Sequence, residues 1–296
     1  MLAWLLILFS LTPSHAQFKF RDPASTPAAC EKRYVIAVMN SPPSYFVEKG
    51  KKTGVGYDIL TEVVRRLQCK YTDMISSNSS LIASFGRRSV DLFGPLLSSA
   101  QLAQGEFILT WKLPRYLVVR KDASGSSLPD VKSVVSDSKM IFGNLISGKF
   151  FLNEQELTKL FAEKRLKEYP LPEDLMIALK ENKIQALFAG PFVLYHYITR
   201  SGQADQYHII EDKTSPLVET GFFMSTTRLS AQERKRIRQV FKEMQEDGTL
   251  LKIVKKYLAP ESYRHFAGED LVTRLSSHRY RDLNNSKYFS FDYHEF

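Results

Sequence analysis

The sequence predicts an α/β protein of two lobes, joined by two extended crossings and separated by a cleft. Short β-branched runs alternate with amphipathic helical stretches in two parts of the chain, and a polar stretch rich in Gly, Ser and Pro at 122–130 divides them. Extended segments near 118–121 and 216–220 would carry the chain out of the first lobe and back. With 296 residues, 44% of them hydrophobic, the chain can bury a sizeable core.

The first alternation runs from residue 33 to residue 94. In its first helix, apolar residues recur three and four positions apart on one face, and Asp58 just before that run is the expected N-cap. A turn is expected at 48–54. The β-α-β-α-β order predicts a parallel sheet with covering helices. The expected elements are, in order, strand 33–39, helix 59–68, strand 70–75, helix 80–88 and strand 90–94.

The second alternation begins with an extended apolar strand at 113–121. Its later strand at 219–226 returns to the first lobe, and a capping box of Ser230 and Glu233 then opens a helix over 231–248. The remaining expected elements are strands at 139–143, 166–169, 184–190 and 206–211, and helices at 151–165, 173–182, 192–202 and 250–258.

Residues 1–16 have the pattern of a secretory signal peptide. The apolar stretch from Leu2 to Leu11 is shorter than the ~20 residues that span a bilayer. Ser14 and Ala16 are small residues that suit a signal-peptidase site. We therefore expect a secreted, soluble protein that works in the periplasm or outside the cell.

Cys30 and Cys69 are the only cysteines in the chain. In an oxidising compartment, two cysteines favour a disulfide. Cys30 precedes the first expected strand and Cys69 precedes the second, so both should lie at the N-terminal edge of neighbouring strands. There the Cα atoms can approach the ~5.5 Å typical of a bridge. The alternative is a pair of free thiols.

Residues 143–149 have the outline G-x-x-x-x-G-K of a nucleotide-binding P-loop. Phe150 stands where a P-loop needs Ser or Thr to ligate Mg²⁺, and a secreted protein meets little ATP or GTP, so the nucleotide interpretation fails. A glycine turn before a helix can still hold an anion through backbone N–H groups. Ser147 would add a hydroxyl and Lys149 a positive charge, unless Lys149 points into solvent beside the cleft.

Four loops should line the cleft, because ligands of hinged α/β proteins bind at strand carboxyl ends and helix N-termini. Tyr45, in the first loop, could either stack on a ligand or pack into the core. Ser98 and Ser99, in the second loop, are candidate ligand contacts. The four loops are residues 40–46, 94–101, 145–150 and 189–192.

The sequence contains no motif that indicates catalysis, a metal site or a cofactor. Neither G-x-S-x-G nor H-x-x-x-H occurs, and both cysteines are expected to pair. For an enzyme on this scaffold, such as a dehydratase of a small carboxylic acid, Glu106 and Lys149 are the available acid and base. The net charge of +9 is dispersed, and the basic helix at 233–245 is explained by a solvated face, so nucleic acid is not an expected partner.

The order of motifs over residues 31–258 resembles the extracellular solute-binding proteins of family 3, the periplasmic partners of polar amino-acid ABC transporters. The resemblance rests on "SPPSYF" with "TGVGYDIL", "LIASFGRRSVDLFGPL" with "EFILT", and "ALKENKIQALFAGPFVLYHYI" with "QEDGTLLKIVKKYL". It implies the type II periplasmic binding protein fold, with lobe 1 at 31–119 and 218–258 and lobe 2 at 120–217. It also implies a Venus-flytrap mechanism, in which the lobes close on a solute and the closed form docks on a membrane permease.

Three elements of that family's amino-acid site are replaced in this sequence. Gln101 falls where the family has an Arg for the α-carboxylate, Gly190 where it has an acidic residue for the α-ammonium, and Ser44 where an aromatic platform would stack. Because Gln cannot supply the ionic part of an Arg fork, a free α-amino acid is not the expected ligand. Lys149, where the family usually has a small hydroxyl residue, could restore the positive charge from the opposite lobe. We therefore expect a monomer that binds a small polar or anionic solute.

The missing Arg and acidic residue fit a second alternative equally well, a secreted sensory or interaction module without a transporter of its own. Residues 259–296 extend beyond the resemblance by nearly forty positions. This aromatic-rich tail either docks on the body or a partner, or is only partly ordered.

Overall fold

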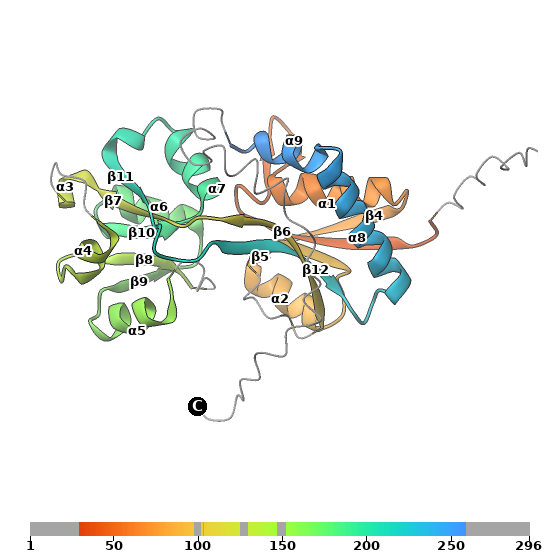
Figure 1. Ribbon diagram of the computed structural model, residues 1–296, viewed down its shortest axis with the longest axis horizontal. Helices are drawn as coiled ribbons and strands as arrows, with labels where there is room; N and C mark the ends of the chain where they lie inside the picture. The colour runs from red at the N-terminus through yellow and green to blue at the C-terminus, as the bar shows by residue number, and fades with distance from the viewer. Residues whose placement is uncertain (1–29, 98–101, 103, 125–129, 147–151, 259–296) are drawn as a thin grey trace, which may run out of the picture.

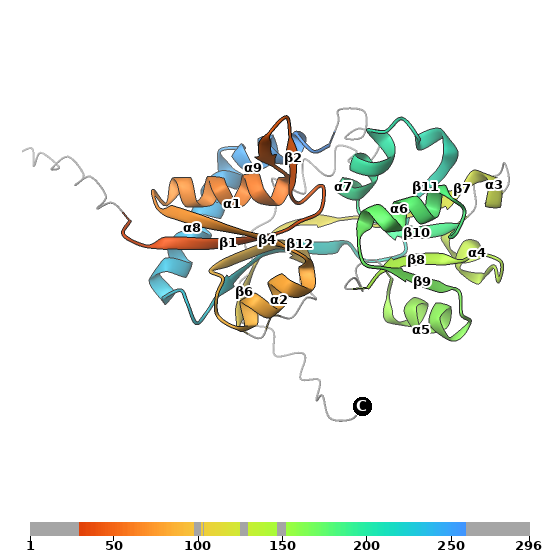
Figure 2. The same cartoon turned by 180° about the vertical axis from the view of Figure 1, so that it is seen from behind.

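The computed structural model describes residues 30–97, 102, 104–124, 130–146 and 152–258. Two lobes, each a sheet with covering helices, are joined by extended strands that run between them (Figure 1, Figure 2). The predicted α/β class with two lobes is confirmed. The expected signal peptide and C-terminal tail lie outside the described residues.

The first lobe is built on a five-stranded mixed sheet with the strand order β4-β1-β5-β12-β6. β1 runs parallel to β4 and β5, as predicted, while β12 is antiparallel to both β5 and β6. The parallel arrangement predicted for the strands at 33–94 is confirmed, and the two strands that connect the lobes, β6 and β12, extend the sheet in antiparallel fashion. The strands are β1 (Arg33–Met39), β4 (Lys70–Ser76), β5 (Leu92–Leu97), β6 (Gly105–Leu113) and β12 (Val218–Ser225).

Helices cover both faces of this first sheet (Figure 1). Three of them share one core with the sheet, and the fourth, α2, packs on the opposite face. The predicted capping box of Ser230 and Glu233 is confirmed at the start of α8. A hairpin of β2 (Phe46–Glu48) and β3 (Lys51–Thr53) occupies the expected turn. The helices are α1 (Val55–Arg66), α2 (Asn78–Gly86), α8 (Ala231–Glu246) and α9 (Thr249–Lys255).

The predicted N-cap role of Asp58 is wrong. Helix α1 begins before it, with Gly54 as the N-cap. Gly54 has a φ of +132°, and a Cβ there would lie 2.3 Å from the carbonyl oxygen of Ser44, so the helix start requires glycine. The Asp58 carboxylate instead accepts hydrogen bonds from the Tyr257 hydroxyl at 2.8 Å and the Lys256 ammonium at 3.0 Å. Asp58 therefore attaches the chain after α9 to α1.

The second lobe has a five-stranded sheet with the order β11-β7-β10-β8-β9. β8 is parallel to β9 and β10, and β7 is antiparallel to β10 and β11. Its strands are β7 (Tyr116–Arg120), β8 (Phe142–Leu145), β9 (Leu166–Tyr169), β10 (Ala186–Ala189) and β11 (Tyr207–Glu211).

Helices also cover both faces of the second sheet. One face packs against α4 and α5, and the other packs against α6, α7 and η2. The single helix predicted at 192–202 is instead the short α7 followed by a π-helical turn, η2. The helical elements are α3 (Lys121–Ser124), α4 (Val131–Ser136), α5 (Glu154–Ala162), α6 (Pro172–Lys180), α7 (Pro191–Leu194), η2 (Tyr195–Thr199) and η3 (Ala204–Gln206).

The chain first changes lobes between β6 and β7, at residues 114–115. The strand predicted over 113–121 is thus split between two sheets, and the crossing lies a few residues before the predicted 118–121. The return lies between β11 and β12. Arg115 and Asp212 link the two crossings: Arg115 Nε donates to Asp212 Oδ2 at 2.7 Å, and the Asp212 backbone N–H donates to the Arg115 carbonyl oxygen at 3.0 Å.

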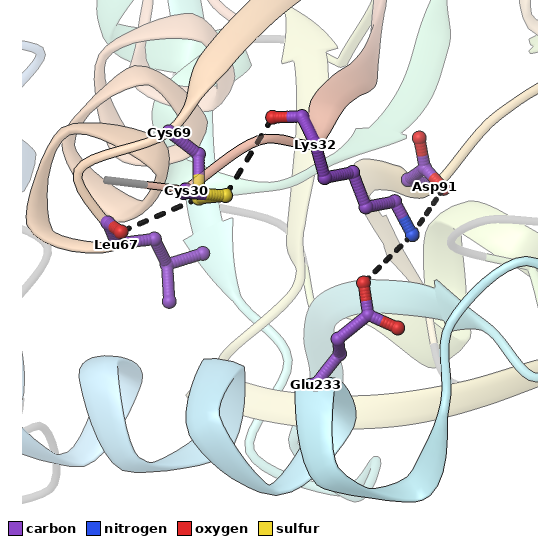
Figure 3. Close-up of a disulfide and its surroundings, with 6 residues drawn as sticks. All are labelled: Cys30, Lys32, Leu67, Cys69, Asp91 and Glu233. Carbon is purple, nitrogen blue, oxygen red and sulfur yellow. Dashed lines mark hydrogen bonds and ion pairs between the residues drawn. A yellow bond between two sulfur atoms is a disulfide. The ribbon is translucent and has the colours of Figure 1, made fainter. Parts of the chain in front are cut away.

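The predicted disulfide between Cys30 and Cys69 is present (Figure 3). Its Cα atoms are 4.8 Å apart, because the parallel neighbours β1 and β4 both begin at this edge of the sheet. Beside it, the Lys32 ammonium donates to Glu233 at 2.8 Å and lies 3.6 Å from Asp91 (Figure 3). Asp91 is fully buried and also accepts a backbone N–H of β1 at 2.8 Å, so its role is structural.

Candidate ligand-binding site

A cavity of about 150 Å³ lies between the two lobes. Each of the four loops predicted to line the cleft contributes to its wall. Among the described lining residues, no side chain is charged. The described lining residues are Met39, Pro42, Pro43, Ser44, Val55, Pro95, Leu96, Leu97, Trp111, Leu113, Leu145, Pro172, Gly190, Phe192, Val193 and Thr220.

An aromatic contact between the lobes forms part of this wall. The ring of Trp111 on β6 has its centroid 5.6 Å from that of Phe192 on α7 and 6.3 Å from that of Phe222 on β12. All three side chains are buried, and Phe192 packs in the hydrophobic core of the first lobe although its helix belongs to the second. A ligand in the cavity therefore meets both lobes at once.

Two lining residues, Ser44 and Trp111, each have a buried polar side-chain atom, Oγ and Nε1, without a hydrogen-bond partner within the described part of the chain. A buried polar group without a partner costs about 1–3 kcal/mol. The backbone fixes Ser44, because its N–H donates to Ser41 at 2.9 Å and its carbonyl oxygen accepts from Gly56 at 3.1 Å.

A second set of contacts joins the lobes where η2 faces the β2–β3 hairpin. Arg200 forms an ion pair with Glu48, and the ring of His196 lies 5.3 Å from that of Phe46. These four residues lie outside the cavity lining and border a more polar hollow beside it. These contacts therefore hold the lobes together in addition to the aromatic contact at the cavity.

Protonation of His196 should weaken this contact. Burial lowers the pKa of His196 and the charge of Arg200 lowers it further, while Glu173 and Glu48 oppose the shift. Because the unfolded pKa of ~6.5 is then higher than the folded one, the stabilisation is complete above pH ~6.5 and is lost as pH falls toward the folded pKa. Between pH 7 and pH 5, urea denaturation should show the free energy of unfolding falling more steeply for the wild type than for His196→Phe, by at most about 1.4 kcal/mol per pH unit. Equal slopes would contradict this.

The candidate ligand contacts predicted from the sequence lie in different parts of the structure. Gly190 lines the cavity and is the N-cap of α7. Tyr45 is buried in the core of the first lobe with its ring 5.5 Å from that of Tyr57, and it is not among the described lining residues. The other candidates lie outside the described residues: Ser98, Ser99, Gln101, Ser147 and Lys149.

Two residues at the centre of the site, Trp111 and Phe192, are not marked by any motif in the sequence. A weak signal for Trp111 exists, because residues 105–113 are rich in β-branched and aromatic types and follow a predicted cleft loop closely. Phe192 ends the loop predicted at 189–192, but nothing in the sequence shows that its ring reaches the other lobe.

The acid or base candidate Glu106 lies away from the cavity. Its carboxylate accepts a hydrogen bond from Arg234 at 2.8 Å and pairs with Arg238, both on α8. These contacts give Glu106 a structural role, so the described residues do not support the dehydratase alternative. In the described segments, no group of three or more His, Cys, Asp or Glu side chains is placed to hold a metal ion. No helix in the same segments has the length and hydropathy needed to cross a membrane.

A family model described as bacterial extracellular solute-binding proteins, family 3, matches residues 34–260. No curated protein sequence gives a significant match.

Many solved structures share the fold. An ancestral arginine-binding protein bound to arginine is 18% identical, with a TM-score of 0.61, over 77% of this chain and 98% of that one. A substrate-binding protein of an ABC uptake transporter from Streptococcus pneumoniae, with bound histidine, is 16% identical, with a TM-score of 0.61, over 81% and 94%. The VFT2 domain of BvgS from Bordetella pertussis is 14% identical, with a TM-score of 0.61, over 76% and 92%. At these identities the likeness establishes the fold.

Proposed function

Because this chain belongs to the bacterial extracellular solute-binding proteins of family 3, we propose that it captures a small solute between its lobes and delivers it to the permease of an ABC transporter. It would do so as a monomer in the periplasm. The first lobe would comprise the segments before residue 114 and from 218 to 258, and the second lobe the segment between them. No step of this function requires a cofactor or a reaction.

The observation that carries the proposal is the cavity walled by both lobes. A solute that contacts Trp111 on one side and Phe192 on the other binds the closed arrangement better than an open one. Its binding therefore shifts the equilibrium toward closure by that difference in affinity. A closed form recognised by a permease would couple capture to transport.

The solute class remains a prediction of the sequence. A small polar or anionic solute is expected from Ser147 and Lys149 together with the loop containing Gln101, and these residues lie outside the described segments. The described part of the wall is uncharged. An anionic group would therefore be bound at those two loops, with the rest of the solute against the apolar wall.

The test is a thermal-shift screen of the purified protein against a library of small metabolites. A ligand at 100 times its dissociation constant should add about 2.7 kcal/mol to the free energy of unfolding. Phe192→Ala should weaken that ligand, while Ile177→Ala, at an exposed site on α6, should not. The proposal fails if no metabolite stabilises the protein, or if the stabilising metabolite binds both variants equally well.

Free amino acids should bind poorly. Gln101 and Gly190 leave neither end of the zwitterion with the ionic partner that amino-acid binders supply, and burial of unpaired charges is costly. We expect no common L-amino acid to bind with a dissociation constant below about 1 mM, equivalent to about −4 kcal/mol. Calorimetric titration with arginine, histidine, glutamine and glutamate measures this, and micromolar binding of any of them would contradict it.

The comparisons do not favour the sensory alternative, although some sensor domains share this fold. Structures related in fold include the BvgS domain and a sensor domain of a histidine kinase, the latter 14% identical with a TM-score of 0.60. A sensory module would bind its solute without stimulating transport. Reconstitution with the cognate permease separates the two functions, because only a transport protein should stimulate solute-dependent ATP hydrolysis.

A further inference from the structure

We infer that η2 and the β2–β3 hairpin form a latch between the lobes, which favours their closed arrangement and slows its opening. The latch consists of Phe46 and Glu48 on the hairpin, His196 on η2 and Arg200 at the end of η2. Its two contacts are the ion pair of Glu48 with Arg200 and the packing of the His196 ring against that of Phe46. The latch acts on the movement of the lobes, so it goes beyond the capture of a solute.

The latch lies outside the cavity that would hold the solute. None of its four residues is among the described residues that line the cavity, and all four border the polar hollow beside it. A solute in the cavity therefore need not touch the latch, and the latch contacts need no solute to form. The two sets of contacts can each contribute to closure.

Each half of the latch continues a segment that lines the cavity. Residues 42–44 line the cavity from the first lobe, and Phe46 and Glu48 follow them directly along the chain. Residues 192–193 line it from the second lobe, and His196 and Arg200 follow in the next turns of the same helical segment. A solute that contacts both segments would thus bring the two halves of the latch together.

A π-helical turn positions the half of the latch that belongs to the second lobe. The backbone N–H of Arg200 donates to the carbonyl oxygen of Tyr195 at 2.9 Å, five residues earlier instead of the usual four. Arg200 therefore follows Tyr195 along one side of the helix. Tyr195 packs against the hydrophobic core of the first lobe, so this side of η2 faces the first lobe. Such turns are rare and are frequently found at functional sites.

The hairpin that carries the other half is attached firmly to the first lobe. The ring of Phe46 has its centroid 6.2 Å from that of Tyr257, which follows α9. The Tyr257 hydroxyl accepts the backbone N–H of Gly54 at 2.9 Å, is hydrogen-bonded to Thr53 at 2.7 Å, and donates to Asp58 at 2.8 Å. A force on the hairpin is therefore passed to the whole lobe.

The exposure of the ion pair makes the latch reversible. The side chains of Glu48 and Arg200 are each 46% exposed, and an ion pair at this exposure contributes little free energy. In the described segments, neither side chain has a second ion-pair partner, so opening returns both charges to water. We expect the pair to change the ratio of closed to open molecules by about 2- to 5-fold.

The experiment measures the distance between the lobes by single-molecule fluorescence energy transfer. The full chain carries a donor and an acceptor dye at two exposed positions, Ile177 on α6 and Lys235 on α8, attached through non-natural amino acids so that the disulfide is untouched. At neutral pH and low salt, with no solute added, Glu48→Gln and Arg200→Gln should each lower the ratio of closed to open molecules by about 2- to 5-fold. The dwell time in the closed state should shorten by the same factor, while the dwell time in the open state stays unchanged.

A control and a rescue make this result specific. Lys183→Gln breaks an exposed ion pair with Glu181 inside the second lobe, and it should leave the ratio unchanged. Exchanging the charges, with Glu48→Arg and Arg200→Glu in one chain, should restore the ratio of the parent. Raising the salt concentration should move the parent toward the single variants, because salt screens exposed charges.

Two outcomes would overturn the inference. The first is a ratio that the single variants do not change, including the case in which they lower the stability in urea and leave the ratio as it is. Such a result would make the contact structural only. The second is an equal change caused by Lys183→Gln, which would show a general effect of charge.

Failure of the latch and failure of the proposed function can be distinguished. If the variants leave the ratio unchanged while a metabolite binds in a Phe192-dependent manner, the latch is wrong and solute capture stands. If the variants change the ratio and the closed dwell time as expected but no metabolite stabilises the protein, solute capture fails and the latch stands.

Discussion

Replacing Arg115 with Met should lower the free energy of unfolding by about 3 to 5 kcal/mol, the usual effect of removing one partner from a buried ion pair. The Arg115 side chain is 5% exposed and lies where the chain first passes between lobes. Urea denaturation of the variant against the wild type measures the loss. This side chain joins both crossings to a helix of the second lobe.

The physical reason is the number of groups that depend on this guanidinium. It donates to Asp212 at 2.7 Å and forms two parallel hydrogen bonds, both 2.7 Å long, with Glu156 on α5. It also lies 4.3 Å from the ring centroid of Phe188. Met replaces the volume of the stem but leaves two carboxylates, one of them fully buried, without their cation.

A matched control and a rescue make this prediction specific. Arg65→Met removes an exposed arginine whose partner, Glu62, lies on the same helix, and should cost less than 1 kcal/mol. Adding Asp212→Asn to Arg115→Met should recover part of the loss, because the buried negative charge is then removed. If Arg115→Met is no more destabilising than Arg65→Met, the buried network does not hold the crossings together.

Local patterns in the sequence predict the strands and helices well, because most strands have an apolar run of their own. The strand at 33–39 and the strand at 166–169 have the bounds predicted for them. The helix start at Asp58 fails for a local reason as well, because the positive φ of Gly54 allows the helix to begin earlier than the side-chain pattern indicates. A residue type that suits an N-cap therefore does not by itself show where a helix begins.

Pairing between distant strands could not be predicted in the same way. The apolar pattern at 113–121 shows that the segment is extended and buried, but it does not say which sheet the segment joins. In the structure, Leu113 pairs with Val218 in the first lobe, while Tyr116 pairs with Ala189 and Glu211 in the second. The partners that decide this are far away along the chain.

One part of the candidate site could be predicted from local patterns in the sequence, and another part could not. The four cleft loops could be predicted because loops at strand carboxyl ends follow from the α/β alternation. The resemblance to family 3 also directed attention to Gly190, and Gly190 lines the cavity. The contact between Trp111 and Phe192 could not be predicted, because it joins two lobes whose relative position no local pattern contains.

Removing the disulfide should cause the second large loss of stability. Cys30→Ser together with Cys69→Ser should lower the free energy of unfolding by about 4 kcal/mol, because the bridge closes a loop with a sequence separation of 39 residues. The loss arises mainly in the unfolded chain, which regains the conformational freedom that the bridge removes. Urea denaturation under non-reducing conditions compares the double variant with the wild type.

The native contacts around the bridge decide whether the double variant keeps its fold. Cys30 and Cys69 lie at the edge where β1 and β4 begin, and those strands pair along their whole length without the bridge. The segment before β1 is also held by Lys32, which donates to Glu233 in the first turn of α8 and to the carbonyl oxygen of Arg228, just before that helix. We therefore expect the double variant to fold and to have the same circular dichroism spectrum as the wild type. Wild-type protein unfolded in the presence of a reductant should match the variant in stability, since both lack the disulfide. A reduced wild type as stable as the oxidised one would contradict the predicted contribution.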